Sequence, residues 1–361
     1  MKKTNISHKN SDLISILNTH FESKFNKARV KLIAMVIIAL CKVQTVNFSK
    51  LSKAFDTESK ANSSLRRIQR FIAEFSINSD IIAKLIFNLL PLKDELTLSI
   101  DRTNWKFGKL DINIFMLGVV YKGVAFPLLF TMLPKRGNSN SRERIDLINR
   151  YIDLFGKSTI GCIVADREFI GQKWLSFLND NKLQYYIRIR NNFKVFIPHK
   201  NKEVKAFWLF NTYKINQFIY YPKIVKINGQ LCYLSGSKLS KGEFLIIVSF
   251  TKPEKAKEYY SQRWQIEMTF RAMKSSGFDI EKTHLQDIKR IEKLILLVMI
   301  AFVWCYKVGI YLHENIKMIT VKKHGRNAIS IFKYGLEYIA NFLLNSKMKN
   351  KVDLFSFLSC T

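Results

Sequence analysis

Three acidic residues, far apart in the chain, have the chemistry needed to hold divalent metal ions. Asp101 follows an alternating run at residues 96–100, and Asp166 follows a short apolar run at residues 160–165. Glu267 lies in a later segment with helical periodicity. Carboxylates brought together repel one another unless cations lie between them, and hard oxygen ligands suit Mg²⁺ or Mn²⁺. Two such ions, about 4 Å apart, stabilise both oxygens of an in-line phosphoryl displacement. The three acids therefore predict a two-metal site that acts on phosphodiesters.

Glu267 belongs to a segment whose polar residues recur on one side of a helix. At about 100° per residue, a continuous helix would bring four of them within an arc of about 60°. These four are Tyr260, Arg263, Glu267 and Lys274. Beside them Ile266, Phe270 and Met273 form an apolar stripe that would pack against a core. An acid flanked by two cations and a phenol suits a site for metal ions and phosphate. The alternative interpretation is a solvated helix face with an Arg263–Glu267 ion pair.

The periodicity between residues 95 and 290 predicts an α/β domain that brings Asp101 and Asp166 together. Residues 112–133 are typical of a hairpin that turns at Lys122-Gly123, and Pro127 indicates an edge strand or a bulge in its second arm. Helical and strand patterns then alternate as far as residue 189. In an open mixed sheet of order 3-2-1-4-5, strands one and four are neighbours, so their carboxyl ends lie side by side.

Around this domain the sequence predicts two helical regions and one β-rich insertion. We divide the chain into a helical N-terminal region at 1–94, an α/β domain at 95–192 and 251–290, a β-rich insertion at 193–250 and a helical region at 291–361. The insertion is assigned from its alternating aromatic and β-branched residues.

The formal net charge of +31 indicates a long polyanionic partner, most simply DNA or RNA. A helix after Asn62 and Ser63 would present Arg66, Arg67 and Arg70 on its polar side. These three arginines are candidates for contacts with DNA, although an ordinary solvated basic face is as consistent with the pattern. Arg102 and Arg167 each follow a predicted metal ligand. They would either bind phosphate or stabilise the neighbouring carboxylates.

Cysteine usage and hydropathy favour a cytoplasmic protein that is not held in a membrane. The five cysteines are scattered without a C-x2-C pair, so we expect buried thiols in a reducing compartment. No apolar run follows Lys2 and Lys3, as a signal peptide would require. Two apolar runs, 32–41 and 294–306, are shorter than the ~20 residues of a membrane span, and we expect core helices there.

Three blocks of this chain resemble the bacterial insertion-sequence transposases of the insertion-sequence-four family, which belong to the DDE class. Residues 101–108 (Asp-Arg-Thr-Asn-Trp-Lys-Phe-Gly) and 165–171 (Ala-Asp-Arg-Glu-Phe-Ile-Gly) resemble the blocks around that family's first two acids. The spacing of Tyr260, Arg263, Glu267 and Lys274 resembles its Y-R-E-K signature.

The resemblance implies a ribonuclease H-like domain with a β-rich insertion and the cut-and-paste movement of a mobile element. It implies that Asp101, Asp166 and Glu267 hold two Mg²⁺ ions, which Mn²⁺ can replace, and that Tyr260, Arg263 and Lys274 bind DNA phosphates near the cleaved end. The expected partners are double-stranded DNA, both terminal inverted repeats and target, and a second copy of the chain in the DNA-bound complex. In such a family an aromatic side chain stacks a flipped base, for which Trp208 in the insertion is a candidate. The expected location is the bacterial nucleoid.

Two other functions remain open from the sequence. A nuclease or resolvase on the same fold would cut DNA without joining it, and a non-catalytic DNA-binding protein would use its acids only for structure. A glycosidase built on two carboxylates is remote, because neither the charge of +31 nor the basic residues near Glu267 would have a role in it.

Overall fold

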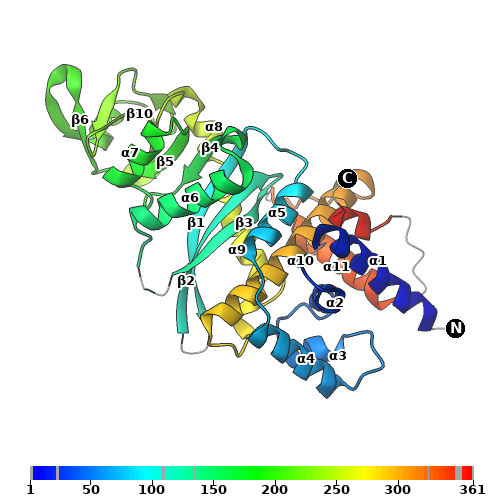
Figure 1. Cartoon of the computed structure of the whole chain (residues 1–361). Coiled ribbons are helices and arrows are strands. Elements are labelled where there is room, and N and C mark those ends of the chain that lie inside the picture. Colours follow the sequence, from blue (N-terminus) through cyan, green and yellow to red (C-terminus); the bar gives the residue numbers. More distant parts are fainter. Residues whose placement is uncertain are drawn as a thin grey trace. The chain divides into compact units, whose positions relative to one another are not determined.

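The computed structural model describes residues 3–21, 24–107, 110–133, 135, 137–323, 325–345 and 352–359. It divides into two compact units (Figure 1). The helical unit comprises Met1–Pro91, Asn104–Ile112 and Thr269–Thr361, and the sheet unit comprises Leu92–Thr103 and Asn113–Met268. The four-part division expected from the sequence stays a prediction.

The sheet has the strand order predicted for its first five strands. Its order is β3-β2-β1-β4-β5-β11-β10-β9-β6-β7, with β8 paired to β10. The first five strands are β1 (Leu96–Phe107), β2 (Leu110–Tyr121), β3 (Val124–Leu133), β4 (Ile160–Ala165) and β5 (Tyr185–Ile189). The pairs β1–β4 and β4–β5 are parallel, whereas β2 and β3 form an antiparallel hairpin. This mixed sheet with flanking helices is the ribonuclease H-like fold.

The conformation of the β2–β3 hairpin accounts for the positions of Gly123 and Pro127 in its sequence. Lys122 and Gly123 both have positive φ, as a two-residue hairpin turn requires. Pro127 lies at a register shift opposite Gly118, on β3 at the edge of the sheet. The prediction of an edge strand or bulge at Pro127 is confirmed. The alternating run at residues 96–100 predicts a strand that ends on Asp101; this end is wrong, because β1 continues to Phe107.

The β-rich insertion extends the same sheet. Its strands are β6 (Lys194–Ile197), β7 (Lys202–Lys205), β8 (Ile219–Tyr220), β9 (Val225–Ile227), β10 (Gln230–Lys238) and β11 (Phe244–Ser249). β11 pairs antiparallel with β5, and β10 pairs antiparallel with β11. Because β11 takes the open edge of β5, the inserted strands continue the central sheet.

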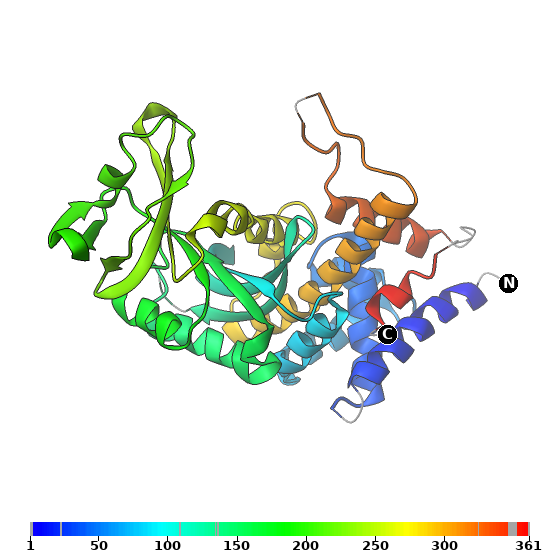
Figure 2. The ribbon, with the colours of Figure 1, turned by 90° about the horizontal axis from the view of Figure 1, so that it is seen from above.

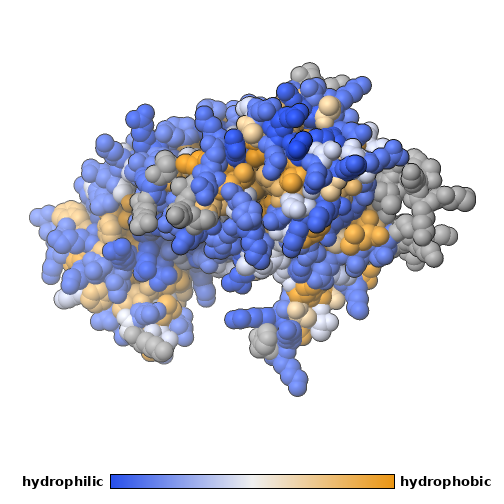
Figure 3. All heavy atoms as spheres, turned by 90° about the horizontal axis from the view of Figure 1, so that it is seen from below, coloured by the Kyte–Doolittle hydropathy of each residue, from blue (hydrophilic) through white to orange (hydrophobic). Residues whose placement is uncertain are grey.

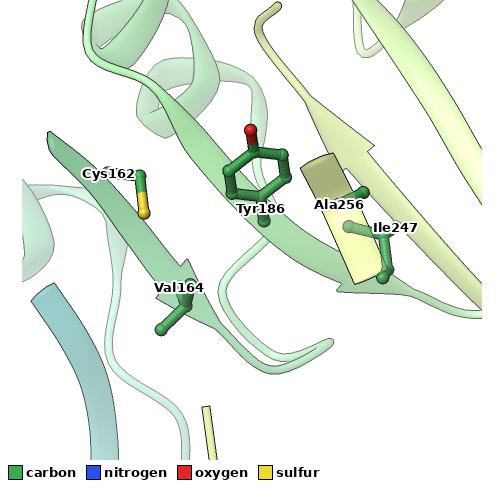
Figure 4. Close-up of a cluster of buried hydrophobic side chains, with 5 residues drawn as sticks. All are labelled: Cys162, Val164, Tyr186, Ile247 and Ala256. Atoms are coloured by element: carbon green, nitrogen blue, oxygen red, sulfur yellow. The ribbon is translucent and has the colours of Figure 1, made fainter. Parts of the chain in front are cut away.

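Helices cover both faces of the sheet. Figure 2 shows α6 (Ser141–Phe155) and α7 (Gln172–Asp180) along one side and α8 (Ala256–Tyr260) on the other. A buried cluster fastens α8 to three adjacent strands (Figure 4). It consists of Cys162, Val164, Tyr186, Ile247 and Ala256. Alternate residues of each strand point to the same face, so this cluster leaves the opposite face to α6 and α7.

The helical unit is built around one long apolar helix, α10 (Ile288–Asn315). Its other helices are α1 (Lys3–Phe21), α2 (Lys27–Val43), α3 (Phe48–Lys53), α4 (Ala61–Glu74), α5 (Ser79–Leu89) and α11 (Ile331–Leu344). α10 is long and apolar enough to cross a membrane, but 89% of its most apolar window is buried inside the protein. Burial of this kind is typical of a core helix, as the sequence predicts.

The cysteines of the described chain are buried thiols. Cys41, Cys162, Cys232 and Cys305 are free and buried, as expected, and Cys360 lies outside the described residues. One helix start differs from the prediction. α4 begins at Ala61 with Lys60 as its N-cap and has no side-chain cap, so Asn62 and Ser63 lie inside the helix.

Candidate active site

Asp101 on β1 and Asp166, directly after β4, occupy neighbouring positions at two adjacent parallel strands. The last residues paired in register between β1 and β4 are Ile100 and Ala165. Asp101 and Asp166 come next in each chain segment, and paired strands are about 4.8 Å apart. The predicted strand order thus brings these two acids to one place on the sheet.

The segment that carries Glu267 is two helices with a bend between them. α8 ends at Tyr260 and α9 (Gln265–Met273) begins five residues later, so the prediction of one continuous helix is wrong. From Gln262 to Glu267 the backbone makes i→i−3 bonds, including Arg263 N–H to the carbonyl of Tyr260 at 3.0 Å and Glu267 N–H to that of Trp264 at 3.0 Å. The hydroxyl of Ser99 on β1 donates to the carbonyl of Arg263 at 3.3 Å, which fixes the bend against the sheet.

The bend places Arg263 between two of the three acids. Its Nη1 lies 3.5 Å from Oδ2 of Asp101, and its Nη2 lies 2.6 Å from Oε1 of Glu267. The hydroxyl of Tyr260 donates to Oδ1 of Asp166 at 3.4 Å. Tyr260 and Arg263 together therefore contact all three acids, and the Glu267 side chain remains 56% exposed.

Lys274, the fourth residue of the Tyr260–Lys274 signature, pairs with an acid outside the three candidate metal ligands. It follows the end of α9, in the helical unit, and its Nζ lies 3.0 Å from Oε2 of Glu281. The common arc predicted for a straight helix is therefore not formed. A phosphate contact by Lys274 stays a prediction.

Burial and nearby charges shift the pKa values of Asp101 and Tyr260. Burial raises the pKa of Asp101 to about 7. The backbone N–H of Arg102 and the charge of Arg263 oppose this rise, whereas Glu168 and Glu267 add to it. Burial and the charge of Asp166 raise the pKa of Tyr260 to about 12, so its phenol stays protonated and can donate.

The guanidinium of Arg102 faces protein acceptors. Its Nε lies 2.8 Å from Oε1 of Glu168, its Nη1 donates to Asn113 at 3.0 Å and its Nη2 donates to Asn138 at 2.8 Å. These contacts indicate that Arg102 positions Glu168 and the loop around it. They do not favour the predicted contact between Arg102 and phosphate. Arg167, by contrast, is exposed and remains a candidate for DNA.

Arg144 fixes the loop that follows Asp166. This buried side chain of α6 donates to the carbonyl of Glu168 at 3.0 Å and to that of Ile170 at 3.4 Å, and its guanidinium lies 5.0 Å from the ring centre of Phe169. Burial lowers the pKa of Arg144 to about 10. Sequence reasoning missed this residue. The available signal was a cation on the apolar side of a predicted helix, three residues before Leu147.

Trp264 and Glu168 are further residues of the site that sequence reasoning missed. Trp264 lies between Arg263 and Gln265 with 47% of its surface exposed. An exposed tryptophan beside a carboxylate cluster offers a flat surface for stacking. The signal for both residues was their place inside the two blocks around Asp166 and Glu267, 165–171 and 260–274.

The donor set fits hard divalent cations in chemistry. Asp101, Asp166 and Glu267 offer only carboxylate oxygens, and the raised pKa of Asp101 marks a place where an added cation would stabilise the ionised form. Among the described residues, however, no three Asp, Glu, His or Cys side chains are close enough together to ligate one ion. The residues therefore fit ions that each take some of the three acids, and the ligand roles stay predictions.

The N-terminal arginines lie in the helical unit, on exposed positions of α4. Arg66 and Arg70 line a cavity of about 690 Å³, together with His284 and Arg290. Arg67 is exposed beside them. This basic cavity suits an anionic ligand, and DNA contact by the three arginines stays a prediction.

Comparison with known proteins gives one family. The family model described as a transposase DDE domain matches residues 93–304, more than half of the chain. No curated protein matches the chain.

Proposed function

The chain belongs to the transposase DDE domain family, and from this premise we propose that it is a cut-and-paste DNA transposase of the insertion-sequence-four type. It cleaves DNA at the ends of an insertion sequence and joins those ends to a target. The observation that carries the proposal is the contact of Arg263 with both Asp101 and Glu267, next to Asp166, which directly follows the neighbouring strand. This brings the acids of the DDE class and the cation of its signature to one place.

In this proposal the three acids hold two Mg²⁺ or Mn²⁺ ions. When bound, such ions activate water or a DNA 3′-hydroxyl for attack and stabilise the leaving 3′ oxygen. Arg263, which pairs with Asp101 and Glu267 in the free protein, would bind a phosphate of the cleaved strand, for which its planar guanidinium is suited. Tyr260, a protonated phenol, donates its one proton to Asp166 in the free protein and would donate it to a phosphate in the DNA complex.

Arg167 and Lys274 are further proposed DNA contacts. Arg167 is exposed after Asp166, and Lys274 carries a charge that a phosphate can take over from Glu281. The partners proposed are the terminal inverted repeats, the target duplex and, in the DNA-bound complex, a second copy of the chain. Trp208, 64% exposed on the short helix Ala206–Leu209, and Trp264 are the candidates for stacking on a flipped base.

Replacing one acid by its neutral isostere tests the proposal. With Mg²⁺ and DNA carrying the element ends, Glu267→Gln is expected to lower both end cleavage and strand transfer by at least roughly 10²-fold, while affinity for the ends is retained. Glu258→Gln is the matched control, because Glu258 is an exposed acid of α8 that pairs only with Lys255 at 3.3 Å among the described residues. Cleavage by Glu267→Gln at the rate of the control contradicts the proposal. Joining of pre-cleaved ends separates a transposase from a nuclease that only cuts.

One observation favours a second candidate, a non-catalytic DNA-binding protein. Arg263 already neutralises part of the charge on Asp101 and Glu267, as a purely structural ion-pair network would. This candidate predicts DNA binding without any activity that depends on divalent metal. A titration of Mg²⁺ into the wild-type cleavage reaction distinguishes the two.

A further inference from the structure

Between α10 and α11 the chain forms a projecting two-stranded segment, residues 316–330, which we call the basic arm. Figure 2 shows it in dark orange, extending away from the two helices of its own unit. The amide of Ala328 donates to the carbonyl of Thr320 at 2.8 Å, the amide of Lys322 donates to that of Arg326 at 2.8 Å, and Val321 and Asn327 form a β-bridge. Gly325 has φ +79°, so a tight turn closes the arm. The arm is thus a short antiparallel ribbon.

The root of the arm is fixed to its helix. Ile319 is buried, and its amide donates to Nδ1 of His313 on α10 at 2.9 Å. The amide of Lys317 donates to the carbonyl of Leu312 at 2.8 Å. The four residues 320–323 beyond Ile319 give a reach of roughly 13 Å at ~3.3 Å per residue. A fixed root with an exposed end orients the arm before any partner binds, which lowers the entropy cost of binding.

The arm carries positive charge without any acid. Its cations are Lys317, Lys322, Lys323 and Arg326, and the sequence has no Asp or Glu between Glu314 and Glu337. These four residues are exposed. Lys317, Lys322 and Lys323 form no ion pair with another residue that the structure describes. In Figure 3 the arm projects at the lower edge of the view, with hydrophilic side chains over most of its surface.

Apolar side chains are exposed on the same ribbon. Ile316, Met318 and Val321 are each more than half exposed, and Met318 reaches 73%. A second copy of the chain would be a poor partner for this surface, because two basic arms repel each other. Double-stranded DNA offers phosphates for the cations and base edges, including thymine methyl groups, for the apolar side chains. Its major groove also admits a two-stranded ribbon.

We propose that the basic arm is a DNA-contact element, which lays its ribbon in a groove of the duplex and binds phosphates through Lys317, Lys322, Lys323 and Arg326. The inference rests on the proposed function in that DNA is the substrate, but it assigns a contact far along the chain from the acids. It predicts that the arm contributes to affinity for any duplex, since phosphate contacts do not read sequence.

The test is the salt dependence of binding by the full chain to a labelled duplex of arbitrary sequence, measured by fluorescence anisotropy. In the variant Lys317→Gln/Lys322→Gln/Lys323→Gln, the dissociation constant at about 0.15 M salt is expected to rise by at least ~10-fold. The slope of log affinity against log salt is expected to fall by roughly one for each lysine that contacts phosphate. The matched control neutralises Lys27, Lys31 and Lys84, three exposed lysines of the same unit, and so removes the same net charge.

Equal affinity and equal slope for the arm variant and the control overturn the proposal. So does a result in which the arm variant binds DNA normally but loses self-association in sedimentation, because the arm would then contact a second copy. The proposed function fails separately. Suppose that wild-type protein shows no metal-dependent cleavage, while the arm variant still has a smaller slope of log affinity against log salt. The arm inference then stands and the transposase assignment does not.

Discussion

The positive charge of Arg263 offsets the electrostatic repulsion between Asp101 and Glu267. It lies within 3.5 Å of Asp101 and 2.6 Å of Glu267, so one guanidinium serves two carboxylates. Even so, the pKa of Asp101 is raised to about 7, chiefly because the carboxyl is buried. The site therefore holds an acid whose ionised form is destabilised in the free protein. The ionised Asp101 lowers the free energy of unfolding of the free protein, and a cation bound beside it would stabilise the carboxylate.

The first prediction follows from this raised pKa. The unfolded chain loses the Asp101 proton near its ordinary pKa of 3.8, whereas the folded chain retains it up to about pH 7. Stability from this group is thus complete below about pH 4 and is lost as pH rises through 7. Asp101→Asn is expected to make the metal-free protein more stable by roughly 2 kcal/mol at pH 8 and to match wild type near pH 4. Urea unfolding at the two pH values measures the difference. Asp146→Asn, on the exposed side of α6, is the control. An equal gain in the free energy of unfolding for this variant would contradict the explanation by the raised pKa of Asp101.

A second prediction concerns Arg144, which touches none of the three acids. Replacing this buried cation by methionine leaves the carbonyls of Glu168 and Ile170 without their donor and frees the loop after Asp166. We expect a loss of roughly 3 kcal/mol in the free energy of unfolding, together with faster hydrogen exchange in residues 166–170. Arg142→Met on the same helix removes only an exposed pair with Asp146 at 3.9 Å and should change stability by less than about 0.5 kcal/mol. Comparable losses in the two variants would show that Arg144 has no special role.

At the scale of elements, the parallel pairing of β1 and β4 determines where Asp101 and Asp166 meet. The sequence predicted that pairing, because the alternating run before Asp101, the apolar run before Asp166 and the hairpin turn at Lys122-Gly123 are local signals. The break between α8 and α9 was not predictable in the same way. No Gly or Pro lies between Tyr260 and Gln265, and the bond that fixes the bend comes from Ser99, far away in the chain.

Other elements follow the same distinction between local and distant causes. The β-rich character of residues 193–250 was visible, but the pairing of β11 with β5 depends on an open sheet edge that no local pattern marks. Likewise, the residue types of the site were visible, whereas the partners of Arg102 and Lys274 come from tertiary contacts. Spacing on an ideal helix placed Lys274 in the cluster, and the bend at Arg263 removed the basis for that placement.

A third prediction tests the start of the β1–β4 pairing. A Cβ on Gly161 would lie 2.5 Å from the backbone carbonyl oxygen of Glu95, a contact that a side-chain rotation cannot relieve. Gly161→Ala is therefore expected to shift the two strands and to lower the free energy of unfolding by roughly 2–3 kcal/mol. Gly171→Ala is the control, because its Cβ would meet only the movable Ser141 hydroxyl at 3.3 Å. Chemical denaturation compares the two. A Gly161→Ala protein as stable as the control would show that this close approach is easily relaxed.

At the scale of the whole molecule, the charge of +31 acts on the free protein as well as on its partner. Like charges distributed along the whole sequence repel one another in the compact state, and DNA binding replaces that repulsion by attraction. Salt screens both effects, with opposite consequences for stability and for affinity. Screening of the net charge by salt should therefore raise the stability of the free protein and lower its affinity for DNA.

The last prediction uses this opposition. Raising NaCl from about 10 mM to 150 mM shortens the Debye length from ~30 Å to ~8 Å and should raise the melting temperature of the DNA-free protein by a few degrees. The same change should weaken binding to a duplex by several orders of magnitude, because counterion release loses its driving force. The internal control is pH near the sequence pI of about 9.9, where the net charge vanishes and the salt effect on melting should disappear. A melting temperature that falls with salt at pH 7 would mean that attractive ion pairs, such as Lys42–Asp56 at 2.6 Å, outweigh the net repulsion.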